Sequence, residues 1–194
     1  IALAIQETAA SYGVQISVPE ILAKFSQPKE AFYKSIGINP KSADELNTRH
    51  FANDDKYLIN TELFSDVRLT LKKLGEKGIK LGIATQRNYA GKIAIRSEIE
   101  AHKLQMLFPL ENALGGEVRK EQKLLLLAKK FGVAPEELLF VGDLPSDIQS
   151  AKKAGVKSAG ISRNESGMAR LKAEKPDYLL RSLSELLEVV GSSR

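Results

Sequence analysis

Apolar residues recur at helical spacing through the first sixty positions of the chain. Ile1, Ile5, Ala9 and Tyr12 fall on one face of a helix, and Gly13 suits the left-handed turn that ends one. Further helices can begin at three prolines, namely Pro19, Pro28 and Pro40. Few runs in this region are typical of strands. The pattern therefore predicts a helical module.

Beyond residue 62 the pattern changes to helices that alternate with short apolar runs. Helices are predicted over residues 66–77, 89–104, 121–131, 146–154 and 184–190. Strands are predicted over residues 79–85, 138–141, 156–161 and 177–180, with a strand or turn over 112–116. Such alternation builds βαβ units, which form a parallel sheet with helices on both faces. We expect a small helical domain over residues 1–62 and a doubly wound, Rossmann-like α/β core over 63–194.

Composition narrows the function classes. The 194 residues include no Cys, which excludes disulfides, thiolate metal sites and Cys nucleophiles. No apolar run approaches the roughly 20 residues of a membrane span, and no secretory segment is visible, so we expect a cytoplasmic protein without membrane contact. The net charge of +5 comes from scattered Lys and Arg with few aromatic residues nearby. This pattern favours solvated helix faces over a nucleic-acid groove and suits a small anionic substrate.

Polar residues follow two of the predicted strands at the edge where parallel sheets bind ligands. Thr85 follows the first, where its hydroxyl and the adjacent N–H groups can bind a phosphoryl oxygen or, equally, cap the next helix. Asp143 and Asp147 follow the strand over 138–141. Two converging carboxylates suit Mg²⁺. Asp147 alone could instead serve the positive end of the helix dipole.

A basic cluster begins the helix over 121–131 and offers Arg119, Lys120 and Lys123. A helix start favours acids, so a cation here can serve a bound phosphate, although a solvated basic turn is the simpler interpretation. His50 and His102 have no partner at metal-ligand spacing and are expected at the surface or half-buried.

Three stretches together resemble the haloacid dehalogenase superfamily, in its phosphoglycolate-phosphatase-like branch. They read "LGIATQR", "RKEQKLLLLAKKFGV" and "LLFVGDLPSDIQSAKKAGV", in the order of the family's second, third and fourth motifs. The resemblance implies a Mg²⁺-dependent phosphatase that hydrolyses a small phosphorylated metabolite, with the helical domain as its cap. It implies phosphoryl binding by Thr85 and the N–H of Gln86, charge neutralisation by Lys120, and Mg²⁺ held by Asp143 and Asp147.

The chain departs from the family in two motifs. The third motif lacks its usual prolines, which leaves Arg119, Lys120 and Lys123 as alternatives for its cation. The first motif, a strand ending in Asp-x-Asp-x-Thr, is absent; the Asp-Asp pair at 54–55 lies in the helical region. Family members place that strand between the strands that end at Thr85 and Val141.

Removing a central strand strips hydrogen bonds from two neighbours at about 1–3 kcal/mol for each buried group, against a net stability of roughly 5–15 kcal/mol. We therefore expect the nucleophilic Asp, which forms an aspartyl-phosphate, in a segment before Ile1. The alternatives are a catalytically inactive relative that binds a phosphorylated ligand or a protein, a phosphomutase, and a phosphonate hydrolase. The last needs a cap lysine, for which Lys24, Lys29 and Lys34 are available.

Overall fold

The computed structural model describes residues 2–24, 29–58, 61–85, 95–96, 98–116 and 118–191. The chain separates into two compact units, Ile1–Thr61 (unit 1) and Glu62–Arg194 (unit 2). Each unit has hydrophobic clusters of its own.

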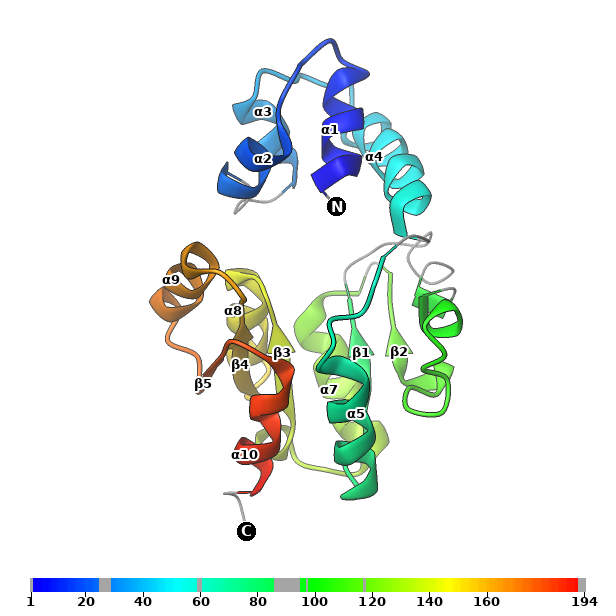
Figure 1. The fold of residues 1–194 in the computed structure, drawn as a ribbon, viewed down its shortest axis with the longest axis vertical. Coiled ribbons are helices and arrows are strands. Elements are labelled where there is room, and N and C mark those ends of the chain that lie inside the picture. The colour runs from blue at the N-terminus through cyan, green and yellow to red at the C-terminus, as the bar shows by residue number, and fades with distance from the viewer. Residues whose placement is uncertain are drawn as a thin grey trace. The chain divides into compact units, whose positions relative to one another are not determined.

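Unit 1 is helical (Figure 1). Its described helices are α1 (Ala2–Ala10), α2 (Val18–Lys24), α3 (Lys29–Ser35) and α4 (Ala43–Leu58). Helix α1 packs against α2 and α4. The centre of this packing holds fully buried side chains, among them Ile5, Phe32 and Leu46.

A buried polar pair lies in the same core. The Tyr33 hydroxyl and His50 Nδ1 are 2.9 Å apart, and both side chains are buried. The expectation that His50 is exposed or half-buried is therefore wrong. Its hydrogen bond to Tyr33 provides a polar partner inside the core, which sequence spacing does not reveal.

Among the described residues of unit 2, the strands pair in parallel and form two sheets. Strand β1 (Ile83–Ala84) pairs with β2 (Ala113–Leu114). Strands β3 (Leu139–Gly142), β4 (Lys157–Ile161) and β5 (Tyr178–Leu180) form the second sheet in that order. The predicted parallel α/β class is confirmed, but the strand predicted over 79–85 pairs only at Ile83 and Ala84. In the part of the chain that the structure describes, β1 has a partner on one side only.

Helices cover both faces of these sheets (Figure 1). Helices α5 (Val67–Glu76) and α10 (Leu186–Gly191) pack on one side, where Leu74 and Leu186 meet Ala159 of β4. Helices α7 (Lys120–Phe131) and α8 (Pro145–Lys153) pack on the other, where Leu124 and Ala151 share a cluster. The arrangement is doubly wound, as βαβ connections require.

Helix α9 (Glu165–Ala173) was not predicted from the sequence. It begins at Asn164, whose side chain accepts a hydrogen bond from the Gly167 N–H at 2.7 Å, and it presents few apolar side chains to the sheet. Short 3-10 helices η1 (Leu110–Asn112), η2 (Pro135–Glu137) and η3 (Leu183–Glu185) complete the described elements. The helix predicted over 89–104 lies partly outside the described residues, and residues 95–96 and 98–101 are helical.

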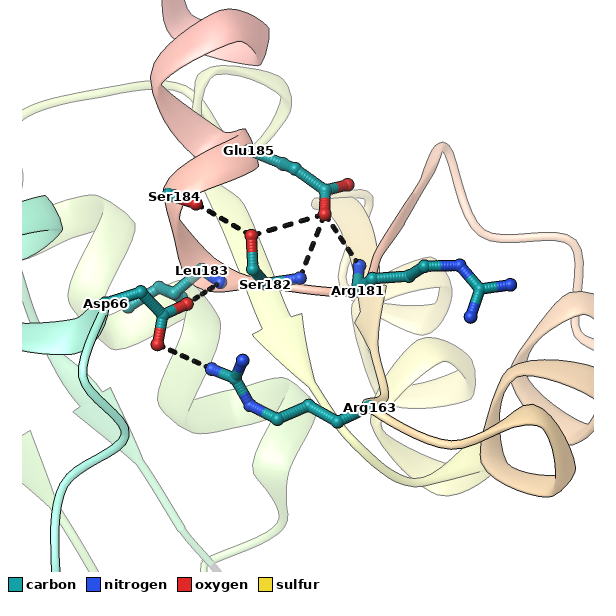
Figure 2. Close-up of polar contacts among 7 residues, drawn as sticks. All are labelled: Asp66, Arg163, Arg181, Ser182, Leu183, Ser184 and Glu185. Atoms are coloured by element: carbon teal, nitrogen blue, oxygen red, sulfur yellow. Dashed lines mark hydrogen bonds and ion pairs between the residues drawn. The ribbon is translucent and has the colours of Figure 1, made fainter.

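A polar network joins the start of α5 to the ends of β4 and β5 (Figure 2). The Asp66 carboxylate accepts from Arg163, which follows β4, and from the Leu183 N–H of η3, both at 2.6 Å. The Glu185 carboxylate accepts from the N–H groups of Arg181 and Ser182, after β5. These bonds fasten three chain segments at the edge of the sheet where the strands end.

A cavity of about 860 Å³ lies between β1 and β3. Its walls come mainly from residues 78–85 and 137–143, with apolar side chains of α5 and α7. This is where the sequence analysis places an additional parallel strand, and that strand stays a prediction. None of the helices in the described ranges is both long enough and apolar enough to cross a membrane.

Candidate active site

Asp147 lies in the first turn of α8 and folds back onto the loop that follows β3. Its Oδ2 accepts hydrogen bonds from the N–H groups of Asp143 and Leu144, both at 3.1 Å. The residue is 3% exposed, so this buried carboxylate is held by backbone donors. Asp147 thus shapes the loop that carries Asp143, besides favouring the positive end of α8.

Gly142 allows this close approach. A Cβ atom at position 142 would lie 2.3 Å from Asp147 Cβ and 2.5 Å from its Oδ2. No side chain larger than hydrogen fits between the end of β3 and the carboxylate. The group that approaches Gly142 closely is therefore the Asp147 side chain.

Lys120 supplies the cation of the site. Its ammonium forms an ion pair with Asp147 Oδ1, and the two side chains are 13% and 5% exposed. The same ammonium lies 5.7 Å from the centre of the Phe140 ring. Arg119 instead pairs with Glu121 at 3.4 Å, and its side chain is 71% exposed. Of these two adjacent cations, Lys120 is the one that lines the cavity.

Thr85 directly follows β1 and lines the same cavity as Lys120, Asp143 and Asp147. Its N–H donates to the Leu114 carbonyl at 3.0 Å, which is one of the hydrogen bonds that pair Ala84 of β1 with Leu114 of β2. The structure therefore brings four of the predicted site residues to one cavity, at the carboxyl ends of β1 and β3. Gln86 lies outside the described residues.

Asp143 is the carboxylate left open toward the cavity. The residue is exposed overall, and among the described residues its carboxylate accepts no hydrogen bond from another residue. Although the residue as a whole is exposed, the surrounding groups partly exclude water from its carboxyl group and raise the pKa of that carboxyl, and the nearby Asp147 carboxylate raises it further. A cation beside Asp143 would offset both effects.

The residues at this site fit a Mg²⁺ ion that takes most of its ligands from water and substrate and few from the protein. The described residues hold no cluster of three or more His, Cys, Asp or Glu side chains suited to a metal. Both oxygens of Asp147 already accept hydrogen bonds, from Lys120 and from two N–H groups. A single open carboxylate at the cavity suits Mg²⁺, which binds through one or two carboxylates plus substrate phosphate.

Lys123, one of the three cations that the sequence offers for this site, is buried next to it. Its side chain is 1% exposed and its ammonium contacts the carbonyl oxygens of Thr85 and Gly116. The sequence spacing indicates this burial, because positions 123, 127 and 131 share the apolar face of α7.

Comparison with known proteins places this geometry in a family. The model of the haloacid dehalogenase-like hydrolase family matches residues 1–161. The chain belongs to the haloacid dehalogenase-like hydrolase family. It is 33% identical to the phosphoglycolate phosphatase of Escherichia coli K12 over 136 residues, which are 68% of this chain and 52% of that protein. It is 32% identical to the phosphoglycolate phosphatase of Vibrio vulnificus over 170 residues, 82% of this chain and 72% of that one.

A solved structure of a haloacid dehalogenase-like family hydrolase from Streptococcus pneumoniae has the same fold. The TM-score is 0.82 at 18% identity, over 97% of this chain and 90% of that one. The similarity supports the fold of this family member across nearly its whole length. The chain spans about half the length of the E. coli phosphoglycolate phosphatase that it matches.

Proposed function

We propose that this haloacid dehalogenase-like hydrolase is a Mg²⁺-dependent phosphatase that hydrolyses a small phosphorylated metabolite, a phosphomonoester like phosphoglycolate. The observation that carries the proposal is the meeting of Thr85, Lys120, Asp143 and Asp147 at one cavity. Relatives named as phosphoglycolate phosphatases support the reaction class. A phosphoryl group carries charge on its oxygens through the transition state, and this cavity offers it a hydroxyl, an ammonium and a metal ligand.

Each residue has a role in this proposal. The Thr85 hydroxyl and the Gln86 N–H bind oxygens of the phosphoryl group. The Lys120 ammonium neutralises charge on the phosphoryl group and on the nucleophile. Asp147 keeps that ammonium in place and fixes the loop that carries Asp143. Lys120 and the loop that carries Asp143 are held by Asp147 before substrate arrives, so little reorganisation of these groups opposes the reaction.

Asp143 would be the protein ligand of Mg²⁺, and Asp147 would support the ion through the loop that carries Asp143. When bound, Mg²⁺ supplies positive charge that offsets the negative charge on the phosphoryl oxygens, and it orients the phosphoryl group. Asp147 contributes through the two N–H groups it holds, since its own oxygens are engaged.

The nucleophile in this proposal is an aspartate at the end of a parallel strand that lies between β1 and β3. Its carboxylate oxygen bonds to phosphorus while the bond from phosphorus to the leaving oxygen breaks, and a second acid gives that oxygen a proton. Water then attacks the phosphorus of the aspartyl-phosphate, which releases inorganic phosphate and regenerates the carboxylate. We propose that unit 1 is the cap whose side chains choose the substrate.

The test uses the full-length protein, phosphoglycolate and other small phosphomonoesters, and measurement of released inorganic phosphate with Mg²⁺ or with EDTA. We expect Mg²⁺-dependent turnover that falls about a hundredfold or more in Asp143→Asn, because charge stabilisation by the ion is lost. Glu136→Gln, an exposed carboxylate of η2, is the control and keeps wild-type turnover.

A second measurement follows binding separately from activity. Mg²⁺ is expected to raise the melting temperature of the wild-type protein and of Glu136→Gln, but not of Asp143→Asn. Equal activity in Asp143→Asn contradicts the metal assignment. Mg²⁺-dependent stabilisation without turnover of any phosphomonoester identifies a catalytically inactive relative instead.

A further inference from the structure

Lys123 is a buried cation for which packing alone gives no reason. It lies on the apolar face of α7 beside Leu124 and Leu127, where an uncharged side chain would pack as well. Within the described part of the chain it forms no ion pair, and its hydrogen-bond partners are two neutral carbonyl groups. Burying an ammonium without a counter-charge is unfavourable. Burial and the neighbouring Lys120 ammonium both lower the pKa of Lys123, in line with that cost.

The two carbonyl groups belong to the chain segments that leave the site. Lys123 Nζ donates to the Thr85 carbonyl at 2.5 Å and to the Gly116 carbonyl at 2.7 Å. Thr85 directly follows β1, and Gly116 lies two residues after β2. The Lys123 ammonium therefore contacts the chain at the carboxyl ends of both paired strands. One of its two contacts is the backbone carbonyl of Thr85, the residue proposed to bind the phosphoryl group.

A bond to the Thr85 carbonyl also sets the orientation of a peptide group. The peptide bond is planar, so fixing its carbonyl fixes the whole group. Thr85 contributes this carbonyl, and its own hydroxyl is a proposed phosphate donor. A small rotation here would turn the donor away from the phosphoryl oxygen.

We propose that Lys123 is a positioning residue for phosphoryl binding: it holds the Thr85 and Gly116 carbonyls and so fixes the backbone of Thr85, whose hydroxyl is proposed to bind the phosphoryl group. The inference rests on the proposed phosphatase function and deepens it. Lys120 lines the cavity itself, while Lys123 acts on phosphoryl binding indirectly, through its hydrogen bond to the Thr85 carbonyl.

The test compares Lys123→Met with Lys130→Met in the full-length protein. Lys130 lies on the same helix and also donates to a backbone carbonyl, that of Glu111 at 2.6 Å, but it is exposed and does not line the cavity. The measurements are kcat and KM for a phosphomonoester with Mg²⁺, the inhibition constant of inorganic phosphate, and the melting temperature.

We expect Lys123→Met to raise KM and the phosphate inhibition constant about tenfold or more, which corresponds to roughly 1.4 kcal/mol of lost binding. Its melting temperature should stay level or rise, because a buried unpaired charge is removed. Lys130→Met should keep wild-type values of all four quantities. A merely structural role predicts the opposite pattern, with a lower melting temperature and unchanged KM.

Wild-type KM and phosphate inhibition in a folded Lys123→Met overturn this inference alone. Absence of Mg²⁺-dependent turnover in the wild-type protein overturns the proposed function, and this inference with it. Lys123→Gln is the second variant, because its shorter side chain cannot reach both carbonyls yet remains polar. Should the Met variant fail to fold, a folded Gln variant carries the test, and wild-type values in it again overturn the inference.

Discussion

At the carboxyl end of β3, a single hydrogen atom in place of a side chain determines where a carboxylate can sit. Gly142 has no Cβ, so Asp147 can fold back and accept the N–H groups of Asp143 and Leu144. The same carboxylate holds the Lys120 ammonium. Two candidate site residues, Asp147 and Lys120, therefore depend on the small volume of a third residue, Gly142.

Gly142→Ala is expected to displace Asp147 and with it Lys120 and the Asp143 loop. The added methyl group would meet the Asp147 side chain at 2.3 Å, a distance that forces a shift. A displacement of about 1 Å among reacting groups lowers a rate by as much as 10²-fold, so we expect a loss of that order in kcat/KM. Melting temperature should fall as well, because a buried carboxylate loses hydrogen bonds.

The control for that variant is Gly75→Ala in α5. A Cβ atom there would meet only Leu107 at 3.8 Å, an ordinary contact, and alanine favours a helix by roughly 0.5–1 kcal/mol over glycine. Gly75→Ala should therefore melt at or above the wild-type temperature with wild-type turnover. Normal kcat/KM in Gly142→Ala would show that the site does not depend on this seat for Asp147.

The helices differ in how well their sequences predicted them. Helix α7 was predicted within one residue of its observed bounds because a regular apolar face runs to Gly132, which takes the left-handed conformation with φ of +70°. Helix α9 was missed because it contains Gly167 and has only Met168 and Leu171 as large apolar residues. Periodicity detects a helix through its buried face, and α9 has little of one.

The strands and the site residues show a second limit of sequence reasoning. A run of apolar residues over 79–85 predicts a strand, but ladder pairing depends on neighbours, and here only Ile83 and Ala84 pair. The strand ends and the order of the motifs predicted that Thr85, Lys120, Asp143 and Asp147 lie at one edge of the fold, and all four line one cavity. The sequence could not show that both oxygens of Asp147 accept hydrogen bonds, since that depends on backbone N–H groups in a tight loop.

The polar network around Asp66 joins the start of α5 to Arg163 and Leu183, and its contribution to protein stability should depend on pH (Figure 2). Burial alone would raise the pKa of the Asp66 carboxyl, but the Leu183 N–H and the Arg163 guanidinium hold it below its ordinary value. A lowered folded-state pKa stabilises the protein above the unfolded value of about 3.9, and this stabilisation is lost as the pH falls through the folded value.

Asp66→Ala is therefore expected to lower the free energy of unfolding by about 1–3 kcal/mol at pH 7, because its partners lose a charged hydrogen-bond acceptor. The difference from wild type should shrink as the pH falls below about 4. Denaturant unfolding at several pH values measures it. Glu165→Ala is the control, since its pair with Arg181 is 81% and 58% exposed and contributes little. A deficit in Asp66→Ala that is constant with pH contradicts this account.

At the scale of the whole molecule, the two units contain separate hydrophobic cores. Regions with their own cores can open in separate steps, so the opening free energies of units 1 and 2 need not change together. The Tyr33–His50 hydrogen bond belongs wholly to unit 1, and the fully buried Ile148 of α8 belongs to unit 2. A mild substitution at each place can therefore report on one unit at a time.

Tyr33→Phe removes one buried hydroxyl and should destabilise unit 1 by about 1 kcal/mol, and Ile148→Val should destabilise unit 2 by about 0.5–1.5 kcal/mol. Hydrogen exchange measured by mass spectrometry resolves the two units. We expect faster exchange in α1 and α4 for Tyr33→Phe and in α8 and β4 for Ile148→Val, by roughly fivefold for 1 kcal/mol. Mg²⁺ should slow exchange in unit 2 of both variants, because Asp143 lies there. If either variant accelerates exchange equally in both units, the chain opens as one cooperative body and a cap that moves independently of the core is excluded.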